Sequence, residues 1–367
     1  MLRREASMVF PVQIRPTDAI REIVELAYKA TENLGYLRDD DIRIGIAPKE
    51  AVYREDNIVL YHYTPEVEVP FSPPLLIVYA LVNRPYMVDL QENRSLVRNL
   101  LAQGMDVYLI DWGYPQKGDR WLTLEDHIDG YIANCVDVLR ERHDLDKINL
   151  LGICQGGTFC LCYTALNPDK VQNLITMVAP VDFHVEEGML NIWSGCAHGP
   201  DSMDIDAMVD ALGNIPGDFM NFGYLMLKPF QLNVEKYIGM ADILDDEAKL
   251  INFLRMEKWI FDSPDQAGET FREFLKDFYQ ANKLIKGEVE IGGRRVDLAN
   301  IKMPVLNLYA EKDHLVPPNS SIALGEYVGT DDYTVHSFPV GHIGMYVSGK
   351  VQKDLPPTIS KWLKERG

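Results

Sequence analysis

The chain has 367 residues, 47% of them hydrophobic and 25% charged, which fits one large or two modest globular domains and excludes a disordered or collagen-like chain. Its 55 acidic and 36 basic residues give a net charge of −19, which disfavours nucleic acid and anionic lipid as partners. The longest apolar run, residues 75–82, is well short of the ~18 residues of a membrane-spanning helix, and no apolar export segment follows the start. The 5 cysteines are too few for a secreted disulfide framework, so we expect a cytoplasmic protein with reduced thiols.

Residues 1–45 are predicted to form an N-terminal helical leader. Beyond them, apolar β-branched runs bounded by turn residues alternate with helix-length amphipathic stretches, a pattern typical of a mostly parallel sheet flanked by helices. The fold class is therefore α/β, with its core in residues 46–182 and 301–367. Strands are predicted over residues 58–63, 75–81, 107–111, 148–151, 174–178, 305–309 and 334–338.

Two longer segments connect these strands. Apolar residues recur at helical spacing from 128 to 139, after a capping box at Thr123 and Asp126, and predict a crossover helix. About 120 residues separate position 182 from position 303, where a simple crossover needs a few tens. Residues 183–300 are therefore predicted to be a helical cap or lid insertion. Its aromatic residues are interpreted mainly as core, with some lining a substrate channel.

The most informative motif lies at residues 149–157, Asn-Leu-Leu-Gly-Ile-Cys-Gln-Gly-Gly. An apolar strand runs into Gly-x-Cys-x-Gly and then into a helix beginning near Gln155, which is a nucleophile elbow with Cys154 in the position usually held by serine. Gly152 and Gly156 keep the flanking positions free of side chains, and the helix N-terminus stabilises a thiolate. Composition alone gives roughly 0.025 chance matches in this chain. Cys154 is therefore predicted to be the nucleophile.

An acid and a histidine should follow an elbow of this kind in chain order, near the ends of later strands. Asp313 stands at the exit of one predicted strand, and His342 follows another within Phe-Pro-Val-Gly-His. The spacing leaves room for the insertion between nucleophile and acid. We therefore predict a Cys154, Asp313 and His342 triad.

Groups that would stabilise a developing oxyanion are also predicted. The backbone N–H of Gln155 is one donor, and a second is expected from Val82 or Asn83, in the loop after the second predicted strand. Arg84 is interpreted either as a side chain that holds an anionic part of the substrate or as a solvated loop residue. His314 is interpreted either as a side chain that supports Asp313 from behind the triad or as a turn residue.

No cofactor or metal site is indicated. The group of His184, Cys196 and His198 fits no familiar zinc spacing, and neither a phosphate-binding lysine loop nor a dinucleotide fingerprint occurs. Cys160 and Cys162 follow the elbow on the same helix and are interpreted as core.

Taken together, these motifs resemble the polyhydroxyalkanoate synthases, specifically the short catalytic subunit of the class III, two-component type. The resemblance is carried by residues 79–86, 111–114, 152–157, 259–266, 313–318 and 341–344, and only residues 1–7 lie outside it. It implies an α/β-hydrolase fold and a cytoplasmic, granule-associated acyltransferase that polymerises (R)-3-hydroxyacyl-CoA, with 3-hydroxybutyryl-CoA as the expected substrate. CoA would be released as a product, with no other cofactor. Catalysis would use Cys154, Asp313 and His342.

The resemblance also implies partners. These are a second, non-catalytic synthase subunit and the surface of a polyester granule, so homo-oligomers and hetero-oligomers are expected. Class IV synthases are also short and use a different partner. The elbow and triad alone leave open a cysteine-dependent hydrolase, such as a thioesterase, lactonase or polyester depolymerase. A structural granule-coating protein on the same scaffold is another reading, against which the intact triad argues.

Overall fold

The computed structural model describes residues 42–68, 70–194, 203–228, 230 and 235–367. The chain forms two compact units, Met1–Arg43 with Lys228–Met256, and Ile44–Leu227 with Glu257–Gly367. The predicted leader over residues 1–45 lies almost wholly outside the described residues. The described part of the smaller unit contains α8 (Lys236–Ala241) and most of α9 (Glu247–Phe261).

The larger unit is built on an eight-stranded sheet in the order β1-β2-β6-β3-β7-β8-β11-β12. Pairing is antiparallel from β1 to β2 and from β2 to β6, and parallel from β6 through β12. The strands are β1 (Lys49–Glu55), β2 (Ile58–Tyr63), β3 (Phe71–Val78), β6 (Met105–Asp111), β7 (Ile148–Ile153), β8 (Val171–Met177), β11 (Val305–Ala310) and β12 (Tyr333–Phe338). Every predicted strand is confirmed, and the predicted α/β class is correct.

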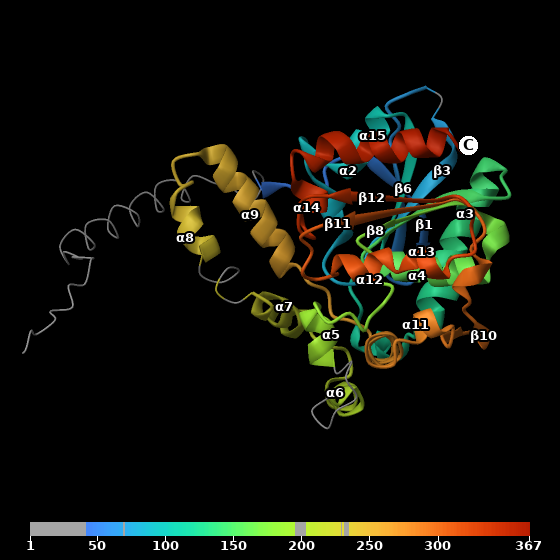
Figure 1. The fold of residues 1–367 in the computed structure, drawn as a ribbon. Helices are drawn as coiled ribbons and strands as arrows, with labels where there is room; N and C mark the ends of the chain where they lie inside the picture. The colour runs from blue at the N-terminus through green and yellow to red at the C-terminus, as the bar shows by residue number, and fades with distance from the viewer. Residues whose placement is uncertain (1–41, 69, 195–202, 229, 231–234) are drawn as a thin grey trace, which may run out of the picture. The chain divides into compact units, whose positions relative to one another are not determined.

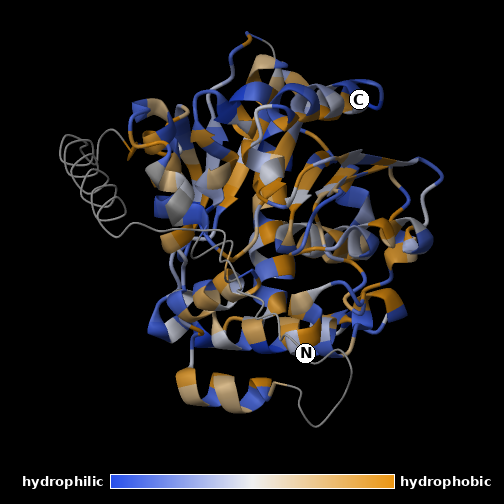
Figure 2. Ribbon diagram, turned by 60° about the vertical axis from the view of Figure 1, so that its left-hand side comes forward, coloured by the Kyte–Doolittle hydropathy of each residue, from blue (hydrophilic) through white to orange (hydrophobic). Residues whose placement is uncertain are grey.

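Helices cover both faces of this sheet (Figure 1). On one face lie α2 (Leu96–Ala102) and α15 (Val351–Lys364), and on the other lie α4 (Gln155–Leu166) and α12 (Pro318–Ile322). Figure 2 shows hydrophobic residues concentrated along the strands between these layers. The central strand β7 is buried along its whole length, which explains why it reads as a continuous apolar run.

The predicted crossover helix is present in two parts. Residues Asp126–Ile132 form a π-helical turn, η4, that continues into α3 (Ala133–His143). The capping box is confirmed: the N–H of Thr123 donates to an Asp126 carboxylate oxygen at 2.7 Å, and the N–H of Asp126 donates to the Thr123 hydroxyl at 3.3 Å.

The segment between β8 and β11 is mostly helical where the structure describes it. Part of it belongs to the larger unit, because Phe274 and Phe278 are buried and pack with Phe159 and Phe183 at ring separations of 5.0–5.9 Å. The interpretation as core is therefore confirmed for Phe274 and Phe278, whereas Phe261 of the same insertion is 55% exposed and does not follow it. The predicted 183–300 cap is divided between the two units, because the smaller unit takes residues 228–256 and the larger unit takes the rest.

Short elements complete the described chain. They are η2 (Pro85–Val88), β4 (Asp89–Gln91), β5 (Arg94–Ser95), η3 (Lys117–Trp121), η5 (Pro168–Lys170), α5 (Met189–Ser194), α6 (Ile205–Leu212), α7 (Gly217–Met226), α10 (Gly268–Glu273), η7 (Phe274–Gln280), α11 (Lys283–Lys286), β9 (Glu290–Ile291), β10 (Arg294–Arg295), η8 (Leu298–Asn300), α13 (Leu324–Tyr327) and α14 (Gly344–Val347). Among the described helices, none combines the length and the apolar composition required to cross a membrane.

Candidate active site

Cys154 occupies a sharp turn between β7 and α4. Its backbone has φ 54° and ψ −127°, a conformation that residues other than glycine rarely adopt. Its N–H donates to Met177 O at 2.9 Å, and its carbonyl accepts from the N–H of Gly157 at 2.8 Å. These bonds hold a strained turn that places the thiol at the first turn of α4. The predicted nucleophile elbow is therefore present in the structure.

The glycines of the motif are required by close packing. A Cβ on Gly152 would lie 2.5 Å from the Cα of Gly157, and a Cβ on Gly156 would lie 2.3 Å from Val78 O. Gly156 therefore lets the start of α4 approach the carboxyl end of β3 more closely than any side chain would allow. This brings the elbow next to the loop that begins at Tyr79.

Asp313 and His342 form a buried pair at the ends of β11 and β12. His342 Nδ1–H donates to Asp313 Oδ2 at 2.7 Å, and the two residues are 4% and 7% exposed. Asp313 Oδ1 accepts from the backbone N–H groups of Leu315 and Val316 at 2.9 and 3.0 Å. The carboxylate is thus fixed on both oxygens, and it fixes the tautomer of the imidazole.

The remaining imidazole nitrogen, Nε2, faces the nucleophile. Burial lowers the pKa of His342, but the charge of Asp313, the charge of Cys154 and hydrogen bonds to both raise it, so that the pKa stands at about 10. The structure therefore brings together the three residues predicted as a triad.

The predicted oxyanion loop is held against the elbow by side chains. The Gln155 side-chain oxygen accepts from the N–H of Leu81 at 3.1 Å, which connects the loop to the start of α4. Asn83 has φ 59°, and its amide donates to the Ser263 hydroxyl at 2.6 Å and to Ile260 O at 3.3 Å. The backbone N–H groups of Gln155, Val82 and Asn83 stay predicted donors.

Arg84 has protein partners within the larger unit. Its guanidinium pairs with Asp111 at 2.8 Å, donates to Gly113 O at 2.7 Å and lies over the ring of Tyr114. The interpretation of Arg84 as a solvated loop residue is therefore wrong, because the side chain is mostly buried in this cluster. His314 is half-buried next to Asp313.

Four tyrosines that the sequence analysis did not single out surround the thiol. Burial and then the charge of Cys154 raise the pKa of both Tyr79 and Tyr224. Burial, then other tyrosines, then Cys154 raise the pKa of Tyr279 and Tyr346. The position of Tyr346 four residues after His342, one helical turn, is a sequence signal that could have identified it.

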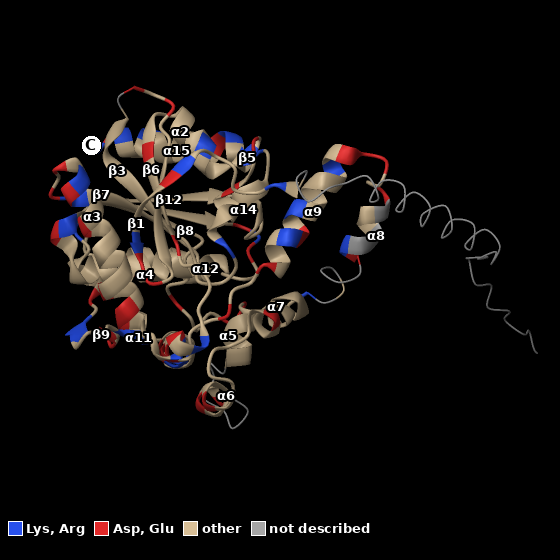
Figure 3. Ribbon diagram, turned by 180° about the vertical axis from the view of Figure 1, so that it is seen from behind, with Lys and Arg blue, Asp and Glu red and all other residues tan. Residues whose placement is uncertain are grey.

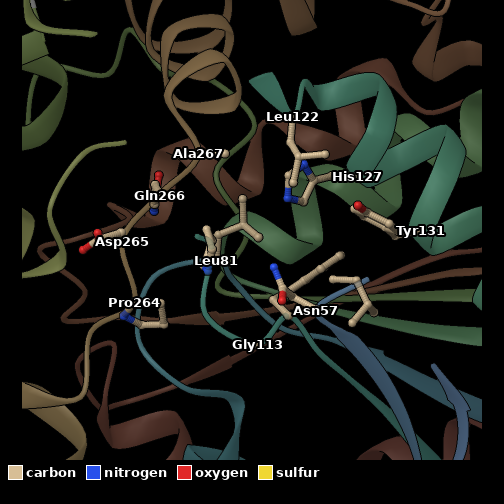
Figure 4. A pocket seen from close by; sticks show the side chains of 13 residues that line it. Asn57, Leu81, Gly113, Leu122, His127, Tyr131, Pro264, Asp265, Gln266 and Ala267 are labelled. Carbon is tan, nitrogen blue, oxygen red and sulfur yellow. The ribbon is translucent and has the colours of Figure 1, made fainter. Parts of the chain in front are cut away.

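A separate small cavity lies beneath the oxyanion loop (Figure 4). It measures about 20 Å³, enough for one water molecule, and is lined by side chains that include Leu81, His127, Tyr131 and Gln266. Burial lowers the pKa of His127, whose Nδ1 lies 2.9 Å from Thr123 O. Cys154 does not line this cavity, so the cavity is separate from the catalytic site.

The structure also tests the predictions for the other cysteines and for a metal site. Cys160 and Cys162 are fully buried in the hydrophobic core, as predicted, and burial raises the pKa of Cys162 to about 12. Cys196 and His198 lie outside the described residues. Within the described residues, no group of three or more histidine, cysteine or acidic side chains has a geometry that could hold a metal ion.

Comparison with known proteins agrees with this geometry. The family model of the alpha/beta hydrolase fold matches residues 73–348, and the model of the poly-beta-hydroxybutyrate polymerase (PhaC) N-terminus matches residues 39–100. The chain is 64% identical over 361 residues to the poly(3-hydroxyalkanoate) polymerase subunit PhaC of Synechocystis sp., covering 97% of this chain and 96% of that protein. The chain belongs to the PhaC family. The family predicted from the sequence motifs is thus confirmed.

Further relatives extend the match. The PhaC subunit of Allochromatium vinosum is 56% identical over 361 residues, covering 98% of this chain and 100% of that protein. Among solved structures, the monoacylglycerol lipase of Paleococcus ferrophilus aligns with a TM-score of 0.53 at 17% identity, covering 85% of this chain and 100% of the lipase. This distant likeness supports the α/β-hydrolase fold alone.

Proposed function

We propose that this PhaC-family chain is a polymerase that joins (R)-3-hydroxyacyl groups from CoA thioesters into a polyester, with Cys154 as the covalent carrier. The observation that carries the proposal is a thiol at a strained elbow that interacts with His342, which is itself paired with the buried Asp313. Membership of the family supplies the substrate class, with 3-hydroxybutyryl-CoA as the substrate for tests. CoA enters as part of the substrate and leaves as product, so the reaction needs no further cofactor.

The first step transfers the acyl group to the protein. His342 Nε2 takes the thiol proton, Cys154 Sγ attacks the thioester carbonyl, and the carbon–sulfur bond to CoA breaks. The proton passes to the departing CoA thiolate. Because one thioester replaces another, the acyl group keeps its transfer potential. The N–H of Gln155 and one from Val82 or Asn83 would stabilise the oxyanion.

The second step lengthens the chain. The 3-hydroxyl of another acyl group attacks the acyl-cysteine carbonyl, and His342 takes the hydroxyl proton as the ester bond forms and the bond to Cys154 Sγ breaks. The proton then returns to sulfur. Asp313 keeps Nδ1 protonated and stabilises the imidazolium in both steps.

Replacement of the nucleophile tests the covalent role. Cys154→Ser should fold, since related hydrolases carry serine at the elbow, but its hydroxyl is harder to deprotonate and its acyl ester has a lower transfer potential than the CoA thioester. We expect polymer formation to fall at least about 100-fold, the scale of a lost proton-transfer contribution. Intact mass should detect any trapped acyl-serine. Cys160→Ala, at a buried cysteine of the same helix, is the matched control and should keep polymer formation. Polymer formation by Cys154→Ser at the normal rate would exclude the mechanism.

A cysteine-dependent hydrolase is the second candidate, because the same triad would hydrolyse a thioester if water reached it. The test is product analysis with 3-hydroxybutyryl-CoA. A polymerase gives insoluble polyester and CoA, whereas a thioesterase gives free 3-hydroxybutyrate and CoA. Free acid as the sole product of the unmodified chain would favour the hydrolase.

The partner and the location belong to the same proposal: a second non-catalytic subunit, homo- and hetero-oligomers, and work in the cytoplasm at a polyester granule. Exposed apolar side chains on α5 and α7 support an apolar partner surface, including Ile192, Trp193, Phe219 and Phe222. Both helices carry few charged residues in Figure 3. CoA release measured with and without the second subunit tests this, and an equal rate in both would argue against a required partner.

A further inference from the structure

Two buried tyrosines lie next to the catalytic imidazole, one in contact with it and the other packed against the first. The Tyr346 hydroxyl lies 3.4 Å from His342 Nε2, and Tyr346 is only 1% exposed. Tyr79, from the loop after β3, packs edge-on against the Tyr346 ring with centroids 6.1 Å apart. Elements that are far apart in the sequence thus place a packed pair of phenols next to one nitrogen.

That nitrogen is the one through which the proposed chemistry must pass. Nδ1 is committed to Asp313, so only Nε2 can take a proton from an attacking hydroxyl. A water molecule able to hydrolyse the acyl-cysteine would have to bind Nε2 within hydrogen-bonding distance and face the thioester carbonyl. The Tyr346 hydroxyl already occupies a hydrogen-bonding position at this atom.

The phenols are poor nucleophiles in this environment. Burial raises the pKa of Tyr346 and of Tyr79 well above the usual value, so both stay protonated and neither forms a phenolate that could accept the acyl group. At 3.4 Å the contact between the Tyr346 hydroxyl and Nε2 is long for a hydrogen bond, so a substrate hydroxyl that binds with better geometry can replace it.

We infer that Tyr346, held in place by Tyr79, is a positioning residue that keeps water from His342 Nε2 and thereby makes the acyl-cysteine react with a chain hydroxyl instead of water. The inference rests on the proposed function. It assigns acceptor specificity to two tyrosines at the end of the sheet, whereas the triad alone would serve a hydrolase equally well.

Removal of one oxygen atom should open the hydrolytic route. In Tyr346→Phe the ring still fills its place, but the space left by the hydroxyl next to Nε2 suits a water molecule. This water would lose a proton to Nε2 as its oxygen bonds to the acyl carbon. The bond to Cys154 Sγ would break, the proton would pass to sulfur, and a free 3-hydroxy acid would leave.

The experiment measures the partition of product. The full chain and its variants are supplied with 3-hydroxybutyryl-CoA, and CoA release, free 3-hydroxybutyrate and polymer are quantified together. In Tyr346→Phe the ratio of free acid to polymer should rise about tenfold, the scale of one lost hydrogen bond. Tyr79→Phe should raise the ratio less, because Tyr79 acts through Tyr346. The double variant should resemble Tyr346→Phe alone.

The matched control is Tyr163→Phe. Tyr163 lies on α4, is fully buried, and its hydroxyl has no hydrogen-bond partner, so the same chemical change there should leave the ratio unchanged. An unchanged ratio in Tyr346→Phe, with CoA still released, would overturn the inference. A ratio that rises equally in Tyr163→Phe would also overturn it. If the unmodified chain itself gives only free acid, the proposed polymerase function fails instead.

Discussion

Asp313 uses each of its carboxylate oxygens for a separate purpose. Oδ1 holds the turn after β11 through the N–H groups of Leu315 and Val316, and Oδ2 holds His342. An asparagine can keep the first function through its amide oxygen, but it presents a neutral group to the imidazole. Asp313→Asn therefore separates the fold of the loop from the electrostatics of the base.

The two chemical steps should respond differently to Asp313→Asn. A thiol is intrinsically more acidic than an alcohol, so His342 needs less help to activate Cys154 than to activate a substrate hydroxyl. We expect the first acylation to retain much of its rate while elongation falls roughly 100-fold or more. Rapid-quench measurement of acyl-enzyme and of chain length resolves the steps. Equal losses in both would contradict this expectation.

The same variant should change how stability depends on pH. The folded pKa of His342, about 10, is raised above the unfolded value of 6.5, so the resulting stabilisation is full below pH 6.5 and is lost as the pH rises through 10. Asp313→Asn removes a main cause of the raised pKa. The difference in free energy of unfolding between parent and variant should be largest near pH 6 and smallest above pH 10. Urea unfolding under reducing conditions at both ends measures it, and a constant difference would contradict the assignment.

At the scale of elements, the elbow depends on helix α4 lying unusually close to β3 and β7. This approach is possible only because Gly152, Gly156 and Gly157 present no side chains to one another or to the neighbouring strands. The strain at Cys154 is therefore balanced by close packing on both sides of the turn.

Gly152→Ala should break this packing. The new methyl group would lie 2.5 Å from the Cα of Gly157 and 2.9 Å from the Cβ of Cys160, so backbone must move, at an expected cost of about 3 kcal/mol or more. Gly130→Ala is the control, because its methyl group would meet nothing closer than 3.8 Å and alanine favours helix by about 0.5–1 kcal/mol. Denaturant unfolding compares the two. Equal stability of the variants would show that the elbow can relax.

Much of this architecture could be predicted because strands buried on both faces appear as continuous apolar runs. Strand β1 (Lys49–Glu55) gave no such signal, since it is an edge strand with several exposed side chains. Pro73 and Pro74 concealed the first half of β3. The elbow was predictable because its backbone requires glycine at fixed spacing.

Other parts of the site required the structure. Tyr79 and Tyr346 lie 267 residues apart in sequence, and a buried tyrosine is ordinarily core, so the four-residue spacing from His342 indicates Tyr346 alone and nothing in a single sequence pairs it with Tyr79. The ion pair of Arg84 with Asp111 joins the loop after β3 to the end of β6, and these side chains meet only in the folded protein. Long-range side-chain partners of this kind have no local signature.

For the molecule as a whole, the insertion between β8 and β11 is the main addition to a hydrolase-like core. Its later part, including η7 (Phe274–Gln280), is packed into the larger unit through Phe274 and Phe278, whereas residues 228–256 belong to the smaller unit. The predicted cap therefore has an anchored part, and a segment that rearranges is expected among the described residues 235–256.

Hydrogen exchange tests this division of the cap. A non-hydrolysable acyl-CoA analogue or the second subunit should slow exchange several-fold in α9 (Glu247–Phe261) and leave η7 unchanged, because Phe274 and Phe278 already anchor η7 in the core. Unchanged exchange in α9 with both additions would leave the insertion without a lid function.

The order of strands in the sheet also has a consequence for biosynthesis. Strands β8 and β11 are neighbours, yet roughly 130 residues separate them in the chain, so their pairing must await a long stretch of translation and a large loop closure. A nascent chain can form β7, the elbow and α4 while Asp313 and His342 are still unmade. Its thiol then lacks a base, so no acyl group is loaded onto an unfinished polypeptide at the ribosome. The protein acquires its reactivity only when the last strands close the sheet.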